Sequence, residues 1–291
     1  METSDMTNAI EVKGLRKDYG DFQLKDVDLT LPGGSILGLI GENGAGKSTT
    51  IKAILGLIRR DGGTVRVFGR EVTGDDPSYK EDIGVVLDEV SFHDPLKVPQ
   101  VGRILSGVYR NWDGARFDAY VDRFQLPRNK KIKEFSRGMK QKLSIATALS
   151  HHPRLLILDE ATSGLDPVVR DELLDEFLAF IQDEDHAVLI SSHITSDLEK
   201  AADYVTYLHR GQVALQGAKD ELLDAYGRLV CSRADLQGVD PDLLLGTRVS
   251  QFGCEALVKD RRAFRRRYPE LTVDPVSLEE IMVFTVRGDE K

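Results

Sequence analysis

A glycine-rich stretch, G-E-N-G-A-G-K-S from Gly41 to Ser48, joins two segments with different hydrophobic periods. The segment before it, Ile36 to Ile40, is a continuous apolar run of the kind found in buried strands. The segment after it repeats apolar residues at helical spacing, at Ile51, Ile54, Leu55 and Ile58. A buried strand that turns through glycines into an amphipathic helix predicts an α/β fold in which the helix packs back on the sheet.

The stretch matches the phosphate-binding pattern G-x-x-x-x-G-K-[ST]. Glycines allow backbone N–H groups to turn inward around a phosphate, and the start of the helix adds the positive end of its dipole. The pattern predicts that Lys47 reaches the β and γ phosphates and that Ser48 holds Mg²⁺. The alternative is a glycine-rich turn without a ligand. The residues expected to bind the nucleotide here are Asn43, Gly44, Gly46, Lys47, Ser48 and Thr49.

A second apolar run, Leu155 to Leu158, is followed directly by two carboxylates, Asp159 and Glu160. At the end of a buried strand, Asp159 is placed to bind Mg²⁺ through water. Glu160 is placed to polarise the attacking water as a general base. The alternative is that the two carboxylates only end the strand. Beside a phosphate-binding loop, the catalytic interpretation is favoured.

Four short apolar runs, at residues 36–40, 83–87, 155–158 and 187–190, are separated by long helical stretches, which predicts a mostly parallel sheet. The interval 98–150 shows helical spacing and no strand pattern, so we expect a helical insert there. A composition shift follows Tyr226 and Gly227. We therefore expect a main domain at residues 8–228 and a small C-terminal α+β accessory domain at residues 229–291.

Composition excludes several classes of protein. A net charge of -9 argues against a basic nucleic-acid binder, so we expect no nucleic-acid partner. No apolar run approaches the ~18 residues of a transmembrane helix, and the first ten residues do not form a signal peptide. Cys231 and Cys254 fit no zinc spacing and are expected to be unpaired thiols in a reducing compartment. These features favour a cytoplasmic protein that reaches a membrane only through a partner.

Three further motifs follow in order. Residues 135–141 read F-S-R-G-M-K-Q, residues 163–166 read S-G-L-D, and residues 191–193 read S-S-H. With these motifs the chain resembles the ATP-binding subunits of ABC transporters over nearly its whole length. The resemblance implies a P-loop NTPase core that binds ATP and Mg²⁺ and hydrolyses ATP. It also implies a second ATPase subunit, like or unlike this one, and a transmembrane permease subunit.

The resemblance assigns further residues by position. Tyr19 matches the aromatic that stacks on adenine, and His193 matches the switch histidine. Ser136 and Gly138 match the signature residues that close on the γ-phosphate held by the opposite subunit, and Asp166 matches the loop after the catalytic glutamate. From the sequence alone, Ser136 is also a plausible N-cap of the helix that follows it.

Two motifs depart from the family pattern. Arg137 and Met139 replace a glycine and the glutamine of the signature L-S-G-G-Q. Asp88, or less favourably Glu89, stands where the family has a glutamine that touches Mg²⁺. A carboxylate can ligate Mg²⁺, but its charge beside the γ-phosphate should weaken ATP binding when the metal is absent.

Both departures, with the S-H-I-T-S-D-L-E stretch at residues 192–199 and the S-L-E-E-I-M stretch at residues 277–282, resemble bacterial ABC-2 exporter ATPases, such as those for phenol-soluble modulins and antimicrobial peptides. The expected function is an ATPase that drives export of peptides or other amphipathic compounds. The alternatives are a non-transport ATPase of the same fold and a regulatory subunit that binds ATP without hydrolysing it.

Two surfaces carry weaker expectations. A groove between the helical insert and the core is expected to receive a short helix of the membrane subunit, with Phe92, Leu96 and Trp112 as candidate lining. The alternative for each of these three residues, at least equally favoured, is a place in the hydrophobic core. A basic run near the C-terminus predicts a solvated helix face or, less favourably, a contact with anionic lipid. Its members are Lys259, Arg261, Arg262, Arg265, Arg266 and Arg267.

Overall fold

The computed structural model describes residues 8–73, 77–88, 92–251 and 253–288. Its centre is a six-stranded sheet of β3 (Ile36–Ile40), β6 (Ile83–Val86), β7 (Leu155–Asp159), β8 (Ala187–Ser192), β9 (Tyr204–His209) and β10 (Gln212–Ala218). The strand order is β10-β9-β3-β8-β7-β6. All neighbours run parallel except β10, which pairs antiparallel with β9 at one edge. The four predicted strands are β3, β6, β7 and β8, and the α/β prediction is confirmed.

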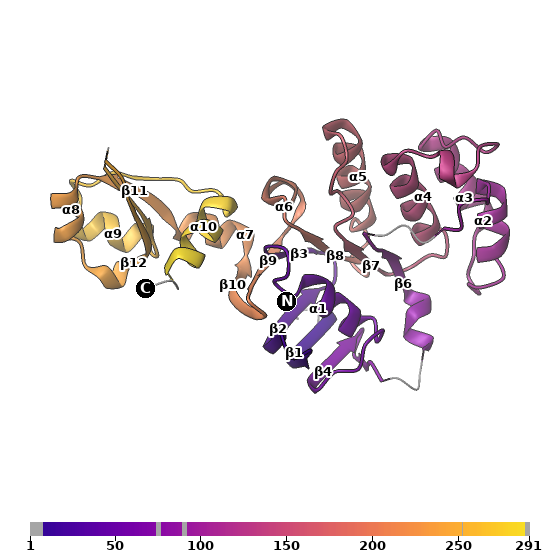
Figure 1. Ribbon diagram of the computed structural model, residues 1–291, viewed down its shortest axis with the longest axis horizontal. Coiled ribbons are helices and arrows are strands. Elements are labelled where there is room, and N and C mark those ends of the chain that lie inside the picture. The colour runs from indigo at the N-terminus through magenta and orange to yellow at the C-terminus, as the bar shows by residue number, and fades with distance from the viewer. Residues whose placement is uncertain (1–7, 74–76, 89–91, 252, 289–291) are drawn as a thin grey trace, which may run out of the picture.

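A second sheet is antiparallel and was not anticipated from the sequence. Its order is β2-β1-β4-β5, with β1 at Asn8–Asp18, β2 at Gln23–Pro32, β4 at Gly62–Val67 and β5 at Arg70–Glu71. Helix α1 (Lys47–Ile54) contacts β4 of this sheet and β7 of the central sheet. One buried cluster joins this helix to both sheets, and it includes Ile10, Leu29, Leu39 and Ile51. The two sheets therefore enclose the helix that follows the glycine-rich loop (Figure 1).

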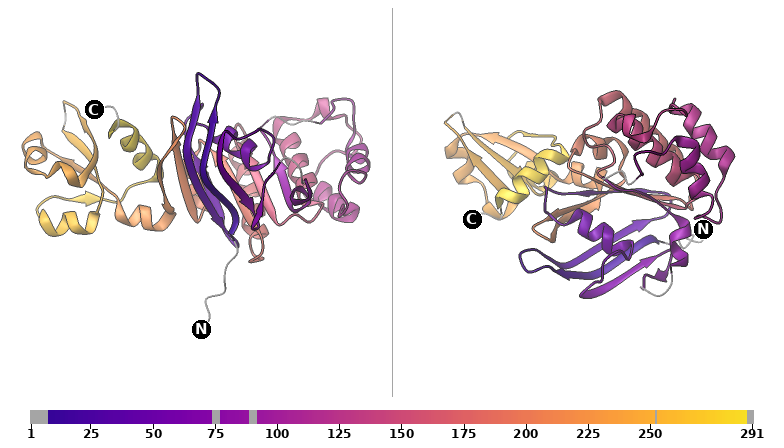
Figure 2. Two further views of the ribbon diagram at one scale, coloured as in Figure 1. Left: turned by 90° about the horizontal axis from the view of Figure 1, so that it is seen from below. Right: turned by 45° about the vertical axis from the view of Figure 1, so that its right-hand side comes forward.

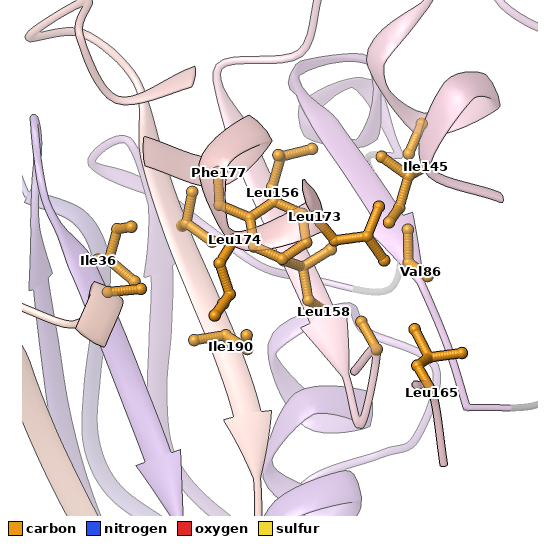
Figure 3. Close-up of a cluster of buried hydrophobic side chains, with 14 of the residues drawn as sticks. Ile36, Val86, Ile145, Leu156, Leu158, Leu165, Leu173, Leu174, Phe177 and Ile190 are labelled. Carbon is orange, nitrogen blue, oxygen red and sulfur yellow. The ribbon is translucent and has the colours of Figure 1, made fainter. Parts of the chain in front are cut away.

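The other face of the central sheet is covered by helices. Leu156 and Leu158 on β7 and Ile190 on β8 point toward Phe177 of α5 (Pro167–Phe180), as Figure 3 shows. Leu155 and Ile157 belong to the cluster on the opposite face. Because successive strand residues point to opposite faces, a continuously apolar strand such as β7 serves both layers.

Three helices lie between β6 and β7 in the chain: α2 (Val98–Leu105), α3 (Gly114–Arg123) and α4 (Arg137–Leu149). A short 3₁₀ turn, η2 (Ile132–Glu134), lies between α3 and α4, and another, η1 (Ser78–Asp82), precedes β6. The described residues of this interval contain no strand. Phe117, Val121 and Phe124 are buried against α4, which in turn packs on β6. These helices form one end of the molecule in Figure 1 and in both views of Figure 2.

The opposite end carries a third sheet, β12-β13-β11-β14, formed by β11 (Gly227–Cys231), β12 (Leu244–Val249), β13 (Cys254–Val258) and β14 (Val273–Asp274). Helices α7 (Lys219–Ala225), α8 (Arg233–Gly238), α9 (Arg261–Arg267) and α10 (Leu278–Gly288) and the short turn η3 (Pro241–Leu243) accompany it. Leu229, Ala256 and Phe264 belong to a cluster of their own. Helix α10 returns to the main body and contacts α6 (Thr195–Ala201), where Leu278 donates its N–H to Glu199 over 2.6 Å.

Two sequence expectations can be placed in this C-terminal part. Cys231 and Cys254 are free thiols that face each other across β11 and β13. Four of the six basic residues near the C-terminus have protein partners: Arg261 and Arg262 bind Asp224, Arg265 donates to the Val273 carbonyl, and Arg267 binds Asp240. Most of the basic run therefore fastens α9 within the chain. Within the described residues, no helix is long and apolar enough to cross a membrane.

Candidate active site

The glycine-rich loop has the geometry of a phosphate cradle. Gly44 and Gly46 have φ of +82° and +112°, a region that disfavours other residues. A Cβ at position 46 would lie 2.5 Å from Leu24 and 3.0 Å from Phe22, whereas one at position 44 would meet nothing within 4 Å. Gly46 therefore lets the loop close on β2, and Gly44 lies in open space. No side chain caps the start of α1, so its first N–H groups are available to an anion.

Lys47 lies beneath the loop with its amino group fully engaged. Its side chain is only 6% exposed, and Nζ donates to the Gly41 carbonyl over 2.7 Å and to the Glu42 carbonyl over 3.3 Å. Nζ also lies 3.2 Å from Oε1 of Glu160. A buried ammonium needs such partners because desolvation penalises its charge. An arriving phosphate would add a stronger anionic partner at the same position.

Glu160 follows β7, at the carboxyl edge of the parallel strands, where open α/β sheets bind ligands. Its backbone has φ of +52°, an uncommon value for a residue with a side chain. Its N–H bonds Ser191 at the end of β8, over 3.2 Å to the carbonyl and 3.1 Å to Oγ. Oε2 lies 2.7 Å from Nδ1 of His193. The carboxylate therefore bridges Lys47 and His193, in a backbone conformation that two bonds to β8 hold.

Asp159 occupies a different environment from its neighbour. It is 4% exposed and accepts a 2.6 Å hydrogen bond from Oγ of Ser191. It is absent from the lining of the pocket described next. Ser191 thus contacts both residues: its hydroxyl donates to the Asp159 carboxylate, and its backbone carbonyl and Oγ accept from the Glu160 N–H.

A pocket of about 290 Å³ opens at the loop. It brings together eight of the predicted site residues from three separate parts of the sequence. Its lining is Phe22, Glu42, Asn43, Gly44, Gly46, Lys47, Ser48, Thr49, Asp88 and Glu160. Glu89, the weaker candidate for the position of Asp88, lies outside the described residues.

The oxygen donors at this pocket fit Mg²⁺. Ser48 offers a hydroxyl and Asp88 a carboxylate in the lining. These two donors agree with the usual mode of Mg²⁺ binding, in which one or two protein oxygens and substrate phosphates share the ion. Among the described residues no cluster of three or more His, Cys, Asp or Glu side chains could hold a metal alone.

The aromatic residue at the pocket differs from the expected one. Tyr19 is 54% exposed, lies beneath the Lys17 ammonium at 5.2 Å, and is not in the lining. Phe22, three residues later in the turn between β1 and β2, lines the pocket and packs against Gly46. Sequence reasoning missed Phe22, although its position in an aromatic-containing turn before the loop was a usable signal.

The signature residues form a second pocket of about 300 Å³. Ser136 is the N-cap of α4, as predicted, and its Oγ accepts from the Met139 N–H over 3.2 Å. Asp166 is the N-cap of α5 and accepts from two N–H groups at 3.1 Å. Two helix starts therefore converge on this pocket. Its lining is Phe124, Ser136, Arg137, Gly138, Met139, Lys142, Gly164, Leu165, Asp166 and Val169.

Behind His193 lies a buried acid that sequence reasoning also missed. Asp197, on α6, has a side chain that is 4% exposed and lies 3.6 Å from Arg170 of α5. Burial raises the pKa of Asp197 above its usual value, and Arg170 opposes that rise only in part. The pair ties the helix after His193 to the helix that begins at Asp166.

An apolar groove of about 520 Å³ lies between β6, α2 and α4. Phe92 and Leu96 line it, together with Val101 and Ile104 of α2. Trp112 does not line it and instead packs against the core, the alternative that the sequence left open. Its ring lies 5.3 Å from Phe117, because the turn before α3 directs it against the helical core.

The chain is similar to known ATP-binding proteins of transporters. The model of the ABC transporter family matches residues 24–163. The daunorubicin/doxorubicin resistance ATP-binding protein DrrA of Streptomyces peucetius is 36% identical over 230 residues, covering 76% of this chain and 68% of that protein. The lantibiotic transport ATP-binding protein SrtF of Streptococcus pyogenes is 33% identical over 214 residues, covering 72% and 91%.

A further relative and a solved structure point the same way. The bacitracin transport ATP-binding protein BcrA of Bacillus licheniformis is 33% identical over 214 residues, covering 72% of this chain and 69% of that protein. A solved ATP-binding subunit of an ABC transporter superposes with a TM-score of 0.68 at 28% identity, covering 80% and 96%. The chain therefore belongs to the ATP-binding proteins of ABC transporters, the ATPase subunits that bind ATP and drive transport.

Proposed function

We propose that this chain is the ATP-hydrolysing motor of an exporter and that Glu160 is its general base. The observation that carries the proposal is the bridge from Lys47 through Glu160 to His193, at the edge of the phosphate-binding pocket. In this role the glycine-rich loop and Lys47 bind the ATP phosphates, and Glu160 accepts a proton from the attacking water. His193 holds the carboxylate oriented toward that water. Tyr19 supplies an exposed ring for the adenine.

Mg²⁺ is the metal that these residues would hold, through the Ser48 hydroxyl, the Asp88 carboxylate and, through water, Asp159. When bound, it would neutralise charge on the phosphates. The protein contributes a buried lysine, N–H groups at the start of α1 and a general base beside them. Catalysis of this kind rests on positioning and electrostatics.

We further propose that the active form is a dimer with a like or homologous subunit. The phosphate pocket and the signature pocket are separate cavities in one chain. The start of α4, with Ser136 and Gly138, is suited to an anion. In a dimer it would close on the γ-phosphate held by the opposite loop, with Asp166 at the same interface. ATP would then hold the two subunits together until hydrolysis releases phosphate.

The membrane partner would be a separate permease that inserts a short helix into the apolar groove. The groove presents Leu96, Val101 and half-exposed Ile104 beside β6, the strand that leads into Asp88. A helix seated there would sense the nucleotide pocket through that strand. The chain would accordingly lie on the cytoplasmic face of the membrane. The relatives' names, which cite daunorubicin, bacitracin and a lantibiotic, favour export of peptides or other amphipathic compounds.

The experiment is a pull-down of tagged Glu160→Gln protein from native membranes in Mg-ATP, with the retained proteins identified by mass spectrometry. A polytopic membrane protein should be retained. It should be lost when Lys47→Ala is added, because nucleotide no longer binds. It should also be lost with Ile104→Arg, which changes the groove while ATP binding persists. Retention of only soluble protein or nucleic acid would contradict the exporter proposal.

A further inference from the structure

The two departures from the family pattern contact each other. Nη2 of Arg137 lies 3.0 Å from Oδ1 of Asp88, and both side chains are about half exposed. Asp88 follows β6 and lines the nucleotide pocket, whereas Arg137 opens α4 and lines the signature pocket. The ion pair therefore joins the two pockets of one chain and ties the start of α4 to the segment after β6.

A third segment, the loop that contains Gly164, also lies close to the guanidinium of Arg137. A Cβ at Gly164 would lie 2.8 Å from Nη1 of Arg137 and 3.1 Å from Cζ, and Gly164 has φ of +68°. A side chain at Gly164 would therefore displace the guanidinium. Arg137 is held between the segment after β6 and the loop that precedes α5.

The position of Arg137 on its helix gives the ion pair with Asp88 an electrostatic role. Arg137 is the first residue of α4, where the helix dipole is positive, and the first turn of α4 contains no acidic residue. A cation at a helix N-terminus is unfavourable, and an adjacent carboxylate offsets it. Asp88, which lies outside the helix and lines the other pocket, supplies this compensating negative charge.

Asp88 also has a competing use. Its carboxylate borders the pocket beside Ser48, where a divalent cation bound with ATP would attract it. We propose that Asp88 exchanges partners: it pairs with Arg137 in the nucleotide-free chain and is withdrawn to Mg²⁺ when Mg-ATP binds. This inference rests on the proposed function.

The exchange has a consequence for the second pocket. Once Asp88 turns to the metal, the guanidinium adds its full charge to the start of α4, beside Ser136 and Gly138. That surface then becomes a stronger site for the phosphate end held by a second subunit. Metal-nucleotide binding in one chain would thus prepare the surface that the chain offers to its partner. Arg137 is a positioning residue in this scheme.

The test is calorimetric titration of the full chain with ATP, once in Mg²⁺ and once in EDTA. The quantity compared is the ratio of the Kd in EDTA to the Kd in Mg²⁺. Arg137→Gln removes the competitor for the metal and leaves Asp88 unneutralised, so the ratio should rise about two- to fivefold, the range of an exposed ion pair. Arg137→Lys, which keeps a charge, should fall between wild type and Arg137→Gln.

Lys140→Gln is the matched control. It removes one positive charge from the same end of α4, and Lys140 faces Asp94 at 3.9 Å, outside the nucleotide pocket. Its ratio should equal that of wild type. In an Asp88→Asn background, Arg137→Gln should no longer raise the ratio, because the exchanging carboxylate is gone.

The outcomes separate the two proposals. An unchanged ratio in Arg137→Gln, with ATP still bound, would overturn the exchange and leave the ATPase assignment intact. A rise of equal size in the Asp88→Asn background would also overturn it. A wild-type chain that binds ATP under neither condition would overturn the proposed function, and the exchange with it.

Discussion

Nδ1 of His193 lies 2.7 Å from Oε2 of Glu160, while the other oxygen of that carboxylate lies 3.2 Å from Nζ of Lys47. The two contacts hold the carboxylate from opposite sides. When phosphate engages Lys47, the contact with His193 would keep Glu160 oriented. Lys47 opens α1, Glu160 follows β7 and His193 follows β8, so the parallel register of β7 and β8 brings Glu160 and His193 together.

Replacing the proposed base should separate binding from turnover. Glu160→Gln keeps the shape of the side chain but cannot accept a proton as a carboxylate does. Phosphate release should fall by about 10²–10⁴-fold, the usual contribution of a general base, while the Kd for ATP stays within a few-fold of wild type. Steady-state phosphate release and equilibrium titration of ATP measure the two quantities.

Glu184→Gln provides the control for that prediction, because it removes a carboxylate that is exposed and distant in sequence from the pocket residues. Its turnover should match wild type. If Glu160→Gln released phosphate at an undiminished rate, the role given to Glu160 would have to be abandoned.

Loss of the imidazole should act on kcat more than on KM. His193→Ala removes the partner of Glu160 and leaves the phosphate loop intact, so kcat should fall by about 10²–10³-fold with little change in the KM for ATP. His152→Ala is a close match, because His152 is also exposed and its Nε2 lies 3.1 Å from a carboxylate, that of Asp113. Equal losses in both variants would show that the effect is structural.

Local patterns predicted the loop and the two carboxylates of this site, and the family resemblance assigned His193. The loop from Gly41 to Ser48, the carboxylates after β7 and His193 after β8 each lie next to a continuous apolar strand, and adjacent parallel strands must bring their carboxyl ends to one edge. The same reasoning predicted four of the six strands of the central sheet, β3, β6, β7 and β8, but not β9 and β10. In each case a few neighbouring residues fix both the element and the position of its side chain.

Other features depend on contacts between distant segments. The ion pair of Asp88 and Arg137 spans 49 positions, and each residue alone was only a departure from a pattern. The antiparallel sheet β2-β1-β4-β5 shows alternating burial in β2, where Val27, Leu29 and Leu31 are buried and the residues between them are exposed. That period-two signal is weaker than the continuous apolar runs of the central strands. Neither feature follows from a single local motif.

The two aromatic residues before the loop, Tyr19 and Phe22, should affect the binding of different ligands. Tyr19→Ala should weaken ATP binding by about two- to tenfold, the range of one aromatic contact, and leave binding of tripolyphosphate unchanged. Phe22 packs against Gly46, so Phe22→Ala should loosen the loop and weaken both ligands. Competition titrations with ATP and tripolyphosphate measure the difference. If Tyr19→Ala binds ATP as wild type does, the adenine contact must be reassigned.

Asp197 provides a prediction about stability and pH. Burial raises the pKa of its carboxyl in the folded chain, so the folded state binds a proton more readily than the unfolded state. Its contribution to stability is therefore largest below the unfolded pKa of about 3.9 and is lost as the pH rises through the raised pKa. At neutral pH the folded chain carries the cost of a buried charge.

Asp197→Asn replaces that charge with a neutral group of the same shape. The melting temperature should therefore rise at pH 7–8, and the gain over wild type should shrink as the pH falls toward the usual range of an aspartate. Thermal unfolding of both proteins across this pH range measures the difference. A lower melting temperature for the variant at pH 7 would mean that the 3.6 Å ion pair with Arg170 outweighs the desolvation of the carboxylate. Asp197 would then stabilise the junction of α5 and α6 through its charge.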